Sequence, residues 1–172
     1  MTTSTSFLVE GAKSYFDAIG AIGVFERAVC NACRSVYDKH KSELVEKIGL
    51  KAGPCQDHDS NKHPEDGIVE LGVFQPSASG RDDFYVYIRW DGTRGDAPEI
   101  SAEICLEFSR KGDRNEYAKL LQKSPFIQPV DEWDFSCLWT SKKLADLSGC
   151  AEALDEQLNG WLSCWPAGRK LK

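Results

Sequence analysis

The sequence lacks the features that direct a protein to a membrane. No basic residue precedes Lys13, so the charged start of a signal peptide is missing. The longest uncharged, mostly apolar stretch, Ala18 to Phe25, has eight residues, whereas a membrane-spanning helix needs about twenty. These absences predict a cytoplasmic protein without a membrane segment. In that compartment, its seven cysteines are expected to be reduced thiols.

An excess of positive charge is also missing. The 21 Lys and Arg residues are outnumbered by 27 Asp and Glu residues, and the net charge is −6. Nucleic-acid binding requires clustered cations that displace counterions, so this charge disfavours a nucleic-acid partner. The sequence contains no P-loop, no dinucleotide-binding glycine motif and no nucleophile elbow. It therefore gives no catalytic signature.

What the sequence does contain is typical of a globular protein. Hydrophobic residues make up 41% and charged residues 28% of its 172 residues. A chain of this length usually builds one hydrophobic core. We therefore expect a single α+β domain over residues 1–172.

The first third of the chain has a helical pattern. Apolar residues three or four apart predict a long helix over residues 24–48. A shorter helix over residues 7–19 is expected to precede it, with Gly20 and Gly23 as the joint. Gly49 stands where a helix C-terminus favours glycine, so the long helix is expected to end there.

Strand patterns follow a long irregular stretch. Residues 49–67, rich in Gly, Pro, Asp and Asn, predict a mobile loop. Apolar and polar residues alternate over 84–90 and 99–108, which is typical of a half-buried antiparallel sheet. Residues 68–75 predict a further strand before these two, and residues 133–139 predict a fourth strand after them.

The remaining segments predict helices. Asp113 and Glu116 are a plausible capping pair for a helix that ends before Pro125. Ser141 is expected to cap a short helix, and residues 150–165 predict the last helix. The expected order is α-α-β-β-β-α-β-α. This order predicts a three-to-four-stranded, mainly antiparallel sheet with helices packed on one face.

One face of the central strands combines aromatic and charged side chains. Tyr85, Tyr87 and Arg89 alternate with apolar residues on one strand, and Glu103 and Glu107 do so on the next. Tyr and Arg are enriched at binding hot spots because they combine contact area with directional donors. The same pairs also occur on simply solvated sheets. The sequence predicts a partner-binding face at these five residues, with a solvated sheet and a face covered by a helix as the alternatives.

Cysteine and histidine residues raise the question of zinc. Cys30 and Cys33, followed by Cys55 and His58, have the spacing of a zinc site with three Cys and one His. That site would require the chain to turn back along the predicted helix, over about 22 Å at 1.5 Å per residue. The local trio of Cys55, His58 and His63 needs no such return, but it has no defined fourth ligand. A solvated loop and core cysteines are the alternative reading.

The order α-β-β-β-α-β over roughly residues 24–139 is similar to the core of the PD-(D/E)XK nucleases. That resemblance implies metal-binding carboxylates on the second and third core strands. In the family, an acidic residue on the third strand is followed two positions later by Lys. Here Cys105 follows Glu103 and Ser109 follows Glu107, so the lysine is missing. A catalytically silent relative and an unrelated α+β fold are both open.

Together these observations favour a non-enzymatic, acidic protein-binding module that modulates or inhibits a macromolecular partner. Immunity proteins and inhibitors of host defence are also small acidic proteins with few motifs, and the analogy with them rests on no shared residues. The alternative is a metal-dependent enzyme, either a diverged hydrolase or a small zinc protein. A protein partner and no cofactor are expected, with zinc as the exception. A homodimer could form through an apolar patch at the tryptophan-rich end, which comprises Trp133, Trp139, Trp161 and Trp165.

Overall fold

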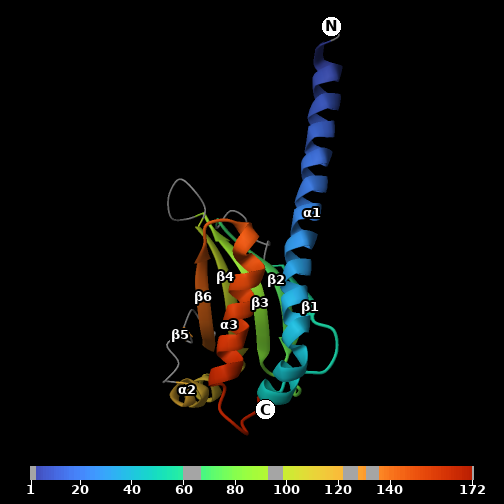
Figure 1. The fold of residues 1–172 in the computed structure, drawn as a ribbon. Coiled ribbons are helices and arrows are strands. Elements are labelled where there is room, and N and C mark those ends of the chain that lie inside the picture. Colours follow the sequence, from blue (N-terminus) through green and yellow to red (C-terminus); the bar gives the residue numbers. More distant parts are fainter. Residues whose placement is uncertain (1–2, 60–66, 93–98, 122–127, 131–135, 172) are drawn as a thin grey trace.

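The computed structural model describes residues 3–59, 67–92, 99–121, 128–130 and 136–171 (Figure 1). Its helices are α1 (Thr3–Glu43), α2 (Lys111–Leu120) and α3 (Cys150–Cys164). A π-helical turn (Leu44–Ile48) continues α1, and a 3-10 turn (Leu147–Gly149) precedes α3. The strands are β1 (Gln56–Asp59), β2 (Ile68–Pro76), β3 (Asp83–Asp91), β4 (Glu99–Phe108), β5 (Gln128–Val130) and β6 (Ser136–Leu144). The chain is an α+β protein with a long N-terminal helix, an antiparallel sheet and two further helices.

The N-terminal third forms one helix rather than the expected two. Gly20 and Gly23 lie inside α1, which is continuous from Thr3 to Glu43. A glycine inside a helix costs about 1 kcal/mol relative to alanine, which lowers stability without forcing a break. Gly49 ends the helical segment as predicted. Its φ is 90°, and its N–H donates to the carbonyl oxygen of Leu44 at 3.1 Å.

The sheet has six strands in the order β1-β2-β3-β4-β6-β5, and all neighbours are antiparallel. The strands predicted at 68–75, 84–90 and 99–108 are confirmed as β2, β3 and β4. The fourth predicted strand is confirmed from residue 136 onward as β6, and residues 133–135 lie outside the described part. The expectation of three to four strands was therefore too low, because both edge strands were missed.

The two missed strands are short and lie at the edges of the sheet. β1 falls within the predicted loop 49–67 and pairs with β2, with Gln56 opposite Phe74. Its sequence Gln-Asp-His-Asp has low strand propensity, so the backbone hydrogen bonds offered by β2 decide its conformation. β5 contains Pro129, which an edge strand tolerates.

The apolar core lies between the sheet and the pair α1 and α3 (Figure 1). The inward side chains of β3 and β4 are fully buried as the alternation predicts: Phe84, Val86, Ile88, Ala102, Ile104 and Leu106. The helical stripe of α1 is buried from residue 29 onward: Val29, Cys33, Val36, His40, Leu44 and Ile48. Trp161 of α3 and Trp165, the residue after α3, are 0% and 7% exposed, so they belong to the core rather than to an exposed patch.

Two predicted helix caps are wrong. α2 begins at Lys111 and its N-cap is Arg110, so Asp113 stands inside the first turn and does not cap it. Ser141 lies in β6 and starts no helix. Instead, Asp146 begins the 3-10 turn before α3, and its side chain accepts a hydrogen bond from the N–H of Ser148 at 2.8 Å. The predicted final helix is confirmed as α3.

Candidate protein-binding face of the sheet

The sheet face turned away from α1 and α3 is called the outer face here. In the strand register its side chains come from alternate positions of five strands. They include His58, Glu70, Phe74, Asp83, Tyr85, Tyr87, Arg89, Asp91, Glu99, Ser101, Glu103, Cys105, Glu107, Cys137, Trp139, Ser141 and Lys143. α2 packs at one end of the inner face, where Tyr117 stacks on Phe108 and Trp165. All five residues predicted to bind a partner lie on the outer face.

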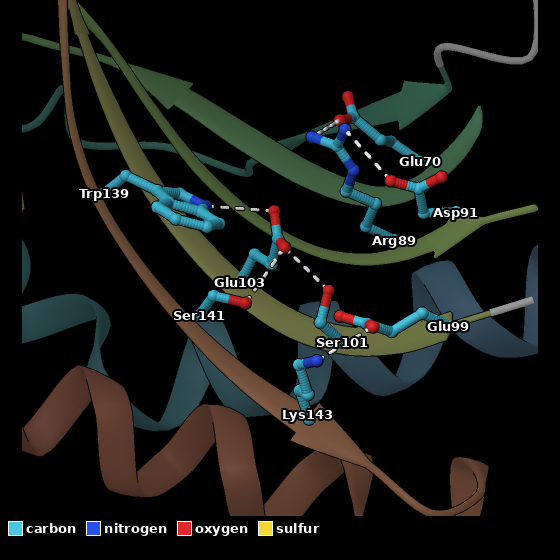
Figure 2. Close-up of polar contacts among 9 residues, drawn as sticks. All are labelled: Glu70, Arg89, Asp91, Glu99, Ser101, Glu103, Trp139, Ser141 and Lys143. Carbon is cyan, nitrogen blue, oxygen red and sulfur yellow. Dashed lines mark hydrogen bonds and ion pairs between the residues drawn. The ribbon is translucent and has the colours of Figure 1, made fainter. Parts of the chain in front are cut away.

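A fully bonded carboxylate lies at the centre of the outer face. Glu103 is 2% exposed, and its Oε1 accepts from the hydroxyls of Ser101 at 2.6 Å and Ser141 at 3.1 Å (Figure 2). Its Oε2 accepts from the indole N–H of Trp139 at 3.0 Å. Tyr87 also bonds to this carboxylate. A buried charge is costly unless it is hydrogen-bonded, and these neutral donors on three strands supply that stabilisation.

A second polar cluster lies toward the edge of the sheet. Arg89 Nη1 is 3.4 Å from Glu70 Oε1, and Arg89 Nη2 is 3.9 Å from Asp91 Oδ2 (Figure 2). The Nε2 of His58 lies 3.5 Å from the other carboxylate oxygen of Glu70. Arg89 remains 25% exposed, so these contacts hold its orientation without removing it from solvent.

Aromatic rings connect these two clusters. The His58 ring centroid is 5.0 Å from that of Tyr85 and 5.6 Å from that of Tyr87, both in edge-to-face geometry. Phe74 stacks on Tyr85 with a centroid separation of 5.6 Å. Edge-to-face and offset-stacked pairs are the favourable arrangements of aromatic rings. The rings of β1, β2 and β3 therefore form one continuous contact layer.

Gly72 makes this layer geometrically feasible. In the register, Gly72 stands between His58 on β1 and Tyr87 on β3. A Cβ at this position would lie 2.2 Å from the carbonyl oxygen of Val86 and 2.5 Å from Cα of Tyr87. Only glycine allows the two backbones to approach this closely. The missing side chain also leaves room for the His58 ring to reach Tyr87 across β2.

The far end of the outer face carries a tyrosine, a carboxyl group and two thiols. The hydroxyl of Tyr85 donates to Glu107 Oε2 at 3.2 Å. Burial raises the pKa of both Tyr85 and Glu107 above their usual values. The pKa of Cys105 is raised as well, mainly by a hydrogen bond with Cys137 and secondly by burial. The Cys105 thiol and the Tyr85 phenol therefore stay protonated at neutral pH, which is unlike an activated nucleophile.

The five predicted residues divide by depth. Tyr87 and Glu103 are only 6% and 2% exposed, so they form the base of the outer face. Tyr85, Arg89 and Glu107 are half-buried and reach its surface. Of the five, these three residues therefore present surface to solvent, while the buried pair connects the neighbouring strands.

The predicted zinc ligands do not converge in the described part of the chain. Cys30, Cys33 and Cys55 are buried on the inner side, and Cys55 Sγ accepts from Arg34 Nη1 at 3.4 Å. His58 lies on the outer face, so the sheet separates it from Cys55. His63 lies outside the described residues. Among the residues described, no group of three or more His, Cys, Asp or Glu side chains could hold a metal ion.

The carboxylates implied by the nuclease resemblance are engaged by neutral donors. Glu103 is bonded to serine, tryptophan and tyrosine side chains, and Glu107 accepts from Tyr85. Neither carboxylate belongs to a metal-binding group within the described ranges. The hydrogen bonds of these two carboxyl groups stabilise the sheet face.

Several residues of the outer face were not identified from the sequence. His58 was considered only as a metal ligand, and Trp139 only as part of an apolar end. Ser101 was placed on the outward side of its strand but left out of the predicted site, and Ser141 was expected to cap a helix. For Trp139, the alternation over 133–139 was an available signal, but its position opposite Cys105 depends on the pairing of β4 with β6.

Comparison of the chain with protein-family models, curated proteins and solved structures finds no match. Within the described residues, no helix is long and apolar enough to span a bilayer. The fold and the outer face thus define an α+β protein with a densely bonded polar and aromatic sheet surface.

Proposed function

We propose that this chain is a non-enzymatic, acidic protein-binding module of the cytoplasm, which modulates or inhibits its partner by binding it through the outer face. The observation that carries this proposal is the layered construction of that face. A bonded base, Glu103 with Tyr87, underlies the half-buried Tyr85, Arg89 and Trp139. Such residue types dominate the energetics of protein interfaces.

Preorganisation supports a binding role for this face. Association is weakened when side chains must be ordered as the complex forms, at about 0.5–1.5 kcal/mol for each immobilised side chain. Arg89 is already held by Glu70 and Asp91, and Tyr85 by Glu107 and the ring of Phe74. These contacts reduce the ordering required on binding.

The charge of the outer face indicates the chemistry of its partner. Glu70, Asp91 and Glu107 lie at or near its surface, and Asp83 and Glu99 continue the same alternation, whereas Arg89 and Lys143 are its Arg and Lys residues in the described part. The whole chain also carries a net charge of −6. A basic protein surface would complement this face and would associate with it rapidly at low ionic strength.

The test is quantitative affinity capture from extract of the source cells, with wild-type protein and the double variant Tyr85→Ala/Arg89→Ala. Both positions are partly exposed, so the fold should survive their truncation, as a thermal melt within a few degrees of wild type would show. We expect the double variant to capture at least tenfold less of a protein that the wild type captures. The single variant Arg81→Ala, which changes an exposed residue in the turn before β3, should capture it fully.

Equal capture by the folded double variant would show that the partner does not bind here. Capture that persists unchanged in 0.5 M salt would contradict the expected basic partner, since interactions between exposed charges are strongly screened at that ionic strength.

A further inference from the structure

The N-terminal half of α1 extends beyond the sheet and carries exposed apolar side chains. Figure 1 shows α1 projecting past the end of the strands, with the N-terminus far from the sheet. α1 becomes buried only from Val29 onward. Five of the seven exposed large hydrophobic residues of the described chain lie on its projecting part: Tyr15 64%, Phe16 69%, Ile19 48%, Ile22 52% and Val24 60% exposed. A sixth, Phe25, is 41% exposed and lies where α1 reaches the sheet, with its ring centroid 5.5 Å from that of Trp90.

Three of these residues continue the stripe with which α1 packs on the sheet. A helix turns about 100° per residue, so Tyr15, Ile19 and Ile22 lie within about 40° of the direction of Cys33. Cys33 is fully buried against the sheet, with its Sγ 3.9 Å from the carbonyl oxygen of Leu71. The same helical face is therefore covered in its second half and uncovered in its first half. We call Tyr15, Ile19 and Ile22 the α1 stripe.

The flanks of the α1 stripe are apolar as well. Phe16 lies on one side of it and Phe25 on the other, by the same helical geometry. Lys13 and Asp17 point to the opposite side of the helix, together with Val24. Over residues 12–25 the apolar face is thus about half of the helix circumference, and Glu26, which stands in line with the α1 stripe, ends it where the sheet begins to cover α1.

We propose that the α1 stripe pairs with the α1 stripe of a second copy of this chain in an antiparallel, two-fold symmetric dimer. This interface is separate from the outer face of the sheet. It covers the same residues on both copies, as a two-fold axis requires. The spacing of the stripe, three and four residues apart, is the spacing that lets two helices pack along a common seam.

The position of the sheet decides the direction of the pair. From Val29 onward, the sheet occupies the side of α1 to which the α1 stripe points. Two parallel helices facing each other through this stripe would bring the two sheets into the same space. An antiparallel pair whose helices cross at an angle near Ile19 places the two sheets at opposite ends, and the crossing angle directs residues 3–8 of each copy away from the partner's sheet.

The available area suffices for such a dimer. Tyr15, Phe16, Ile19, Ile22 and Phe25 each expose about half of their surface. At roughly 100 Å² each, they supply about 500 Å² per copy and about 1,000 Å² in total. That total is at the lower end for a specific interface, so we expect dissociation in the micromolar range.

A second copy fits this surface better than a lipid surface does. Helices that lie on membranes carry several Lys or Arg residues on their polar face. Between residues 12 and 25, Lys13 is the only cationic residue, and it is balanced by Asp17. Charge attraction to anionic lipid would therefore add little to the binding of this helix. Pairing with another α1 stripe removes the apolar side chains of both copies from water.

The experiment compares the wild type with Ile19→Glu/Ile22→Glu and with Val24→Glu by sedimentation equilibrium between about 1 and 100 µM. We expect the wild type to reach twice its 19.2 kDa mass over this range. The stripe variant should stay monomeric, with at least a thirtyfold weaker association. Val24→Glu is the matched control, because it adds a charge to an equally exposed position on the opposite side, and it should dimerise like the wild type.

Two further readouts make the outcome decisive. The five Trp residues all lie outside α1, so unchanged Trp fluorescence would show that the sheet is intact in both variants. Small-angle scattering of the dimer should show two separated masses, as the antiparallel pair requires. A monomeric wild type at 100 µM would overturn the proposal, and so would equal association of the stripe variant. A wild type that stays monomeric but sediments with anionic vesicles would assign the stripe to a lipid surface instead.

Discussion

The indole N–H of Trp139 donates to the carboxylate of Glu103 at 3.0 Å, from β6 to the neighbouring strand β4. Glu103 is 2% exposed, so water can replace this donor only poorly. The carboxylate keeps Ser101, Ser141 and Tyr87 as partners, but a buried charge needs each of its hydrogen bonds.

We expect Trp139→Phe to destabilise the protein by about 1–3 kcal/mol, because it retains an aromatic ring and removes one hydrogen bond to a buried charge. Urea unfolding followed by circular dichroism measures this change. Lys143→Ala, on the same strand, removes the pairing of an exposed lysine with Glu99 and should cost less than about 1 kcal/mol. If both variants lost the same stability, the buried hydrogen bond would not be responsible.

Gly72→Ala should be more damaging than an added methyl group usually is. The new Cβ would stand 2.2 Å from the carbonyl oxygen of Val86, and a backbone atom cannot rotate away. We expect a loss of about 2–3 kcal/mol, since β2 and β3 must move apart. Gly112→Ala in α2 is the matched control, because its Cβ would meet nothing within 4 Å, and it should be neutral or stabilising. Thermal melts of both variants give the comparison.

Glu107→Gln should stabilise the protein at pH 7. Burial raises the pKa of Glu107 in the folded state, so folding favours its protonated form, and its contribution becomes unfavourable as the pH rises above the unfolded value. Gln is uncharged and can still accept from Tyr85. We expect a gain of less than about 1 kcal/mol at pH 7, because the group is partly solvated. The gain should vanish near pH 4, where the carboxyl group is protonated in both states. Urea midpoints measured at both pH values report this difference, and a gain that persisted at pH 4 would refute the charge-based cause.

Alternation identified the side of the sheet on which each residue lies, but not its depth. Along β3 and β4, every second residue was placed correctly because the period of two is a property of the strand itself. That Tyr87 and Glu103 are buried on the outer face could not be predicted in this way. Their burial depends on His58 and Trp139, which arrive from strands that the local pattern does not place beside them.

Elements whose conformation depends on a partner were the ones missed. β1 consists of polar residues and becomes a strand because the edge of β2 offers hydrogen bonds. The converse holds at Gly20 and Gly23, where residue type predicted a break and the helix nevertheless continues. The strong signals were the long periodic stretches: the stripe of α1 from residue 29, the three central strands, and α3. Burial of a single face produces a regular spacing of apolar residues, and this spacing can be read from the sequence.

The C-terminal part of the described chain contacts the first helical segment. The N–H of Leu171 donates to the carbonyl oxygen of Ile48 at 2.8 Å, and Asp155 of α3 meets Lys39 and His40 of α1, each at 2.7 Å. On the ribosome, α1 is synthesised before α3. At about 5–20 residues per second, roughly 6 to 25 seconds separate the emergence of these two elements. Throughout that interval the apolar side of α1 lacks its final cover. The nascent chain is therefore a candidate for chaperone protection until α3 has emerged.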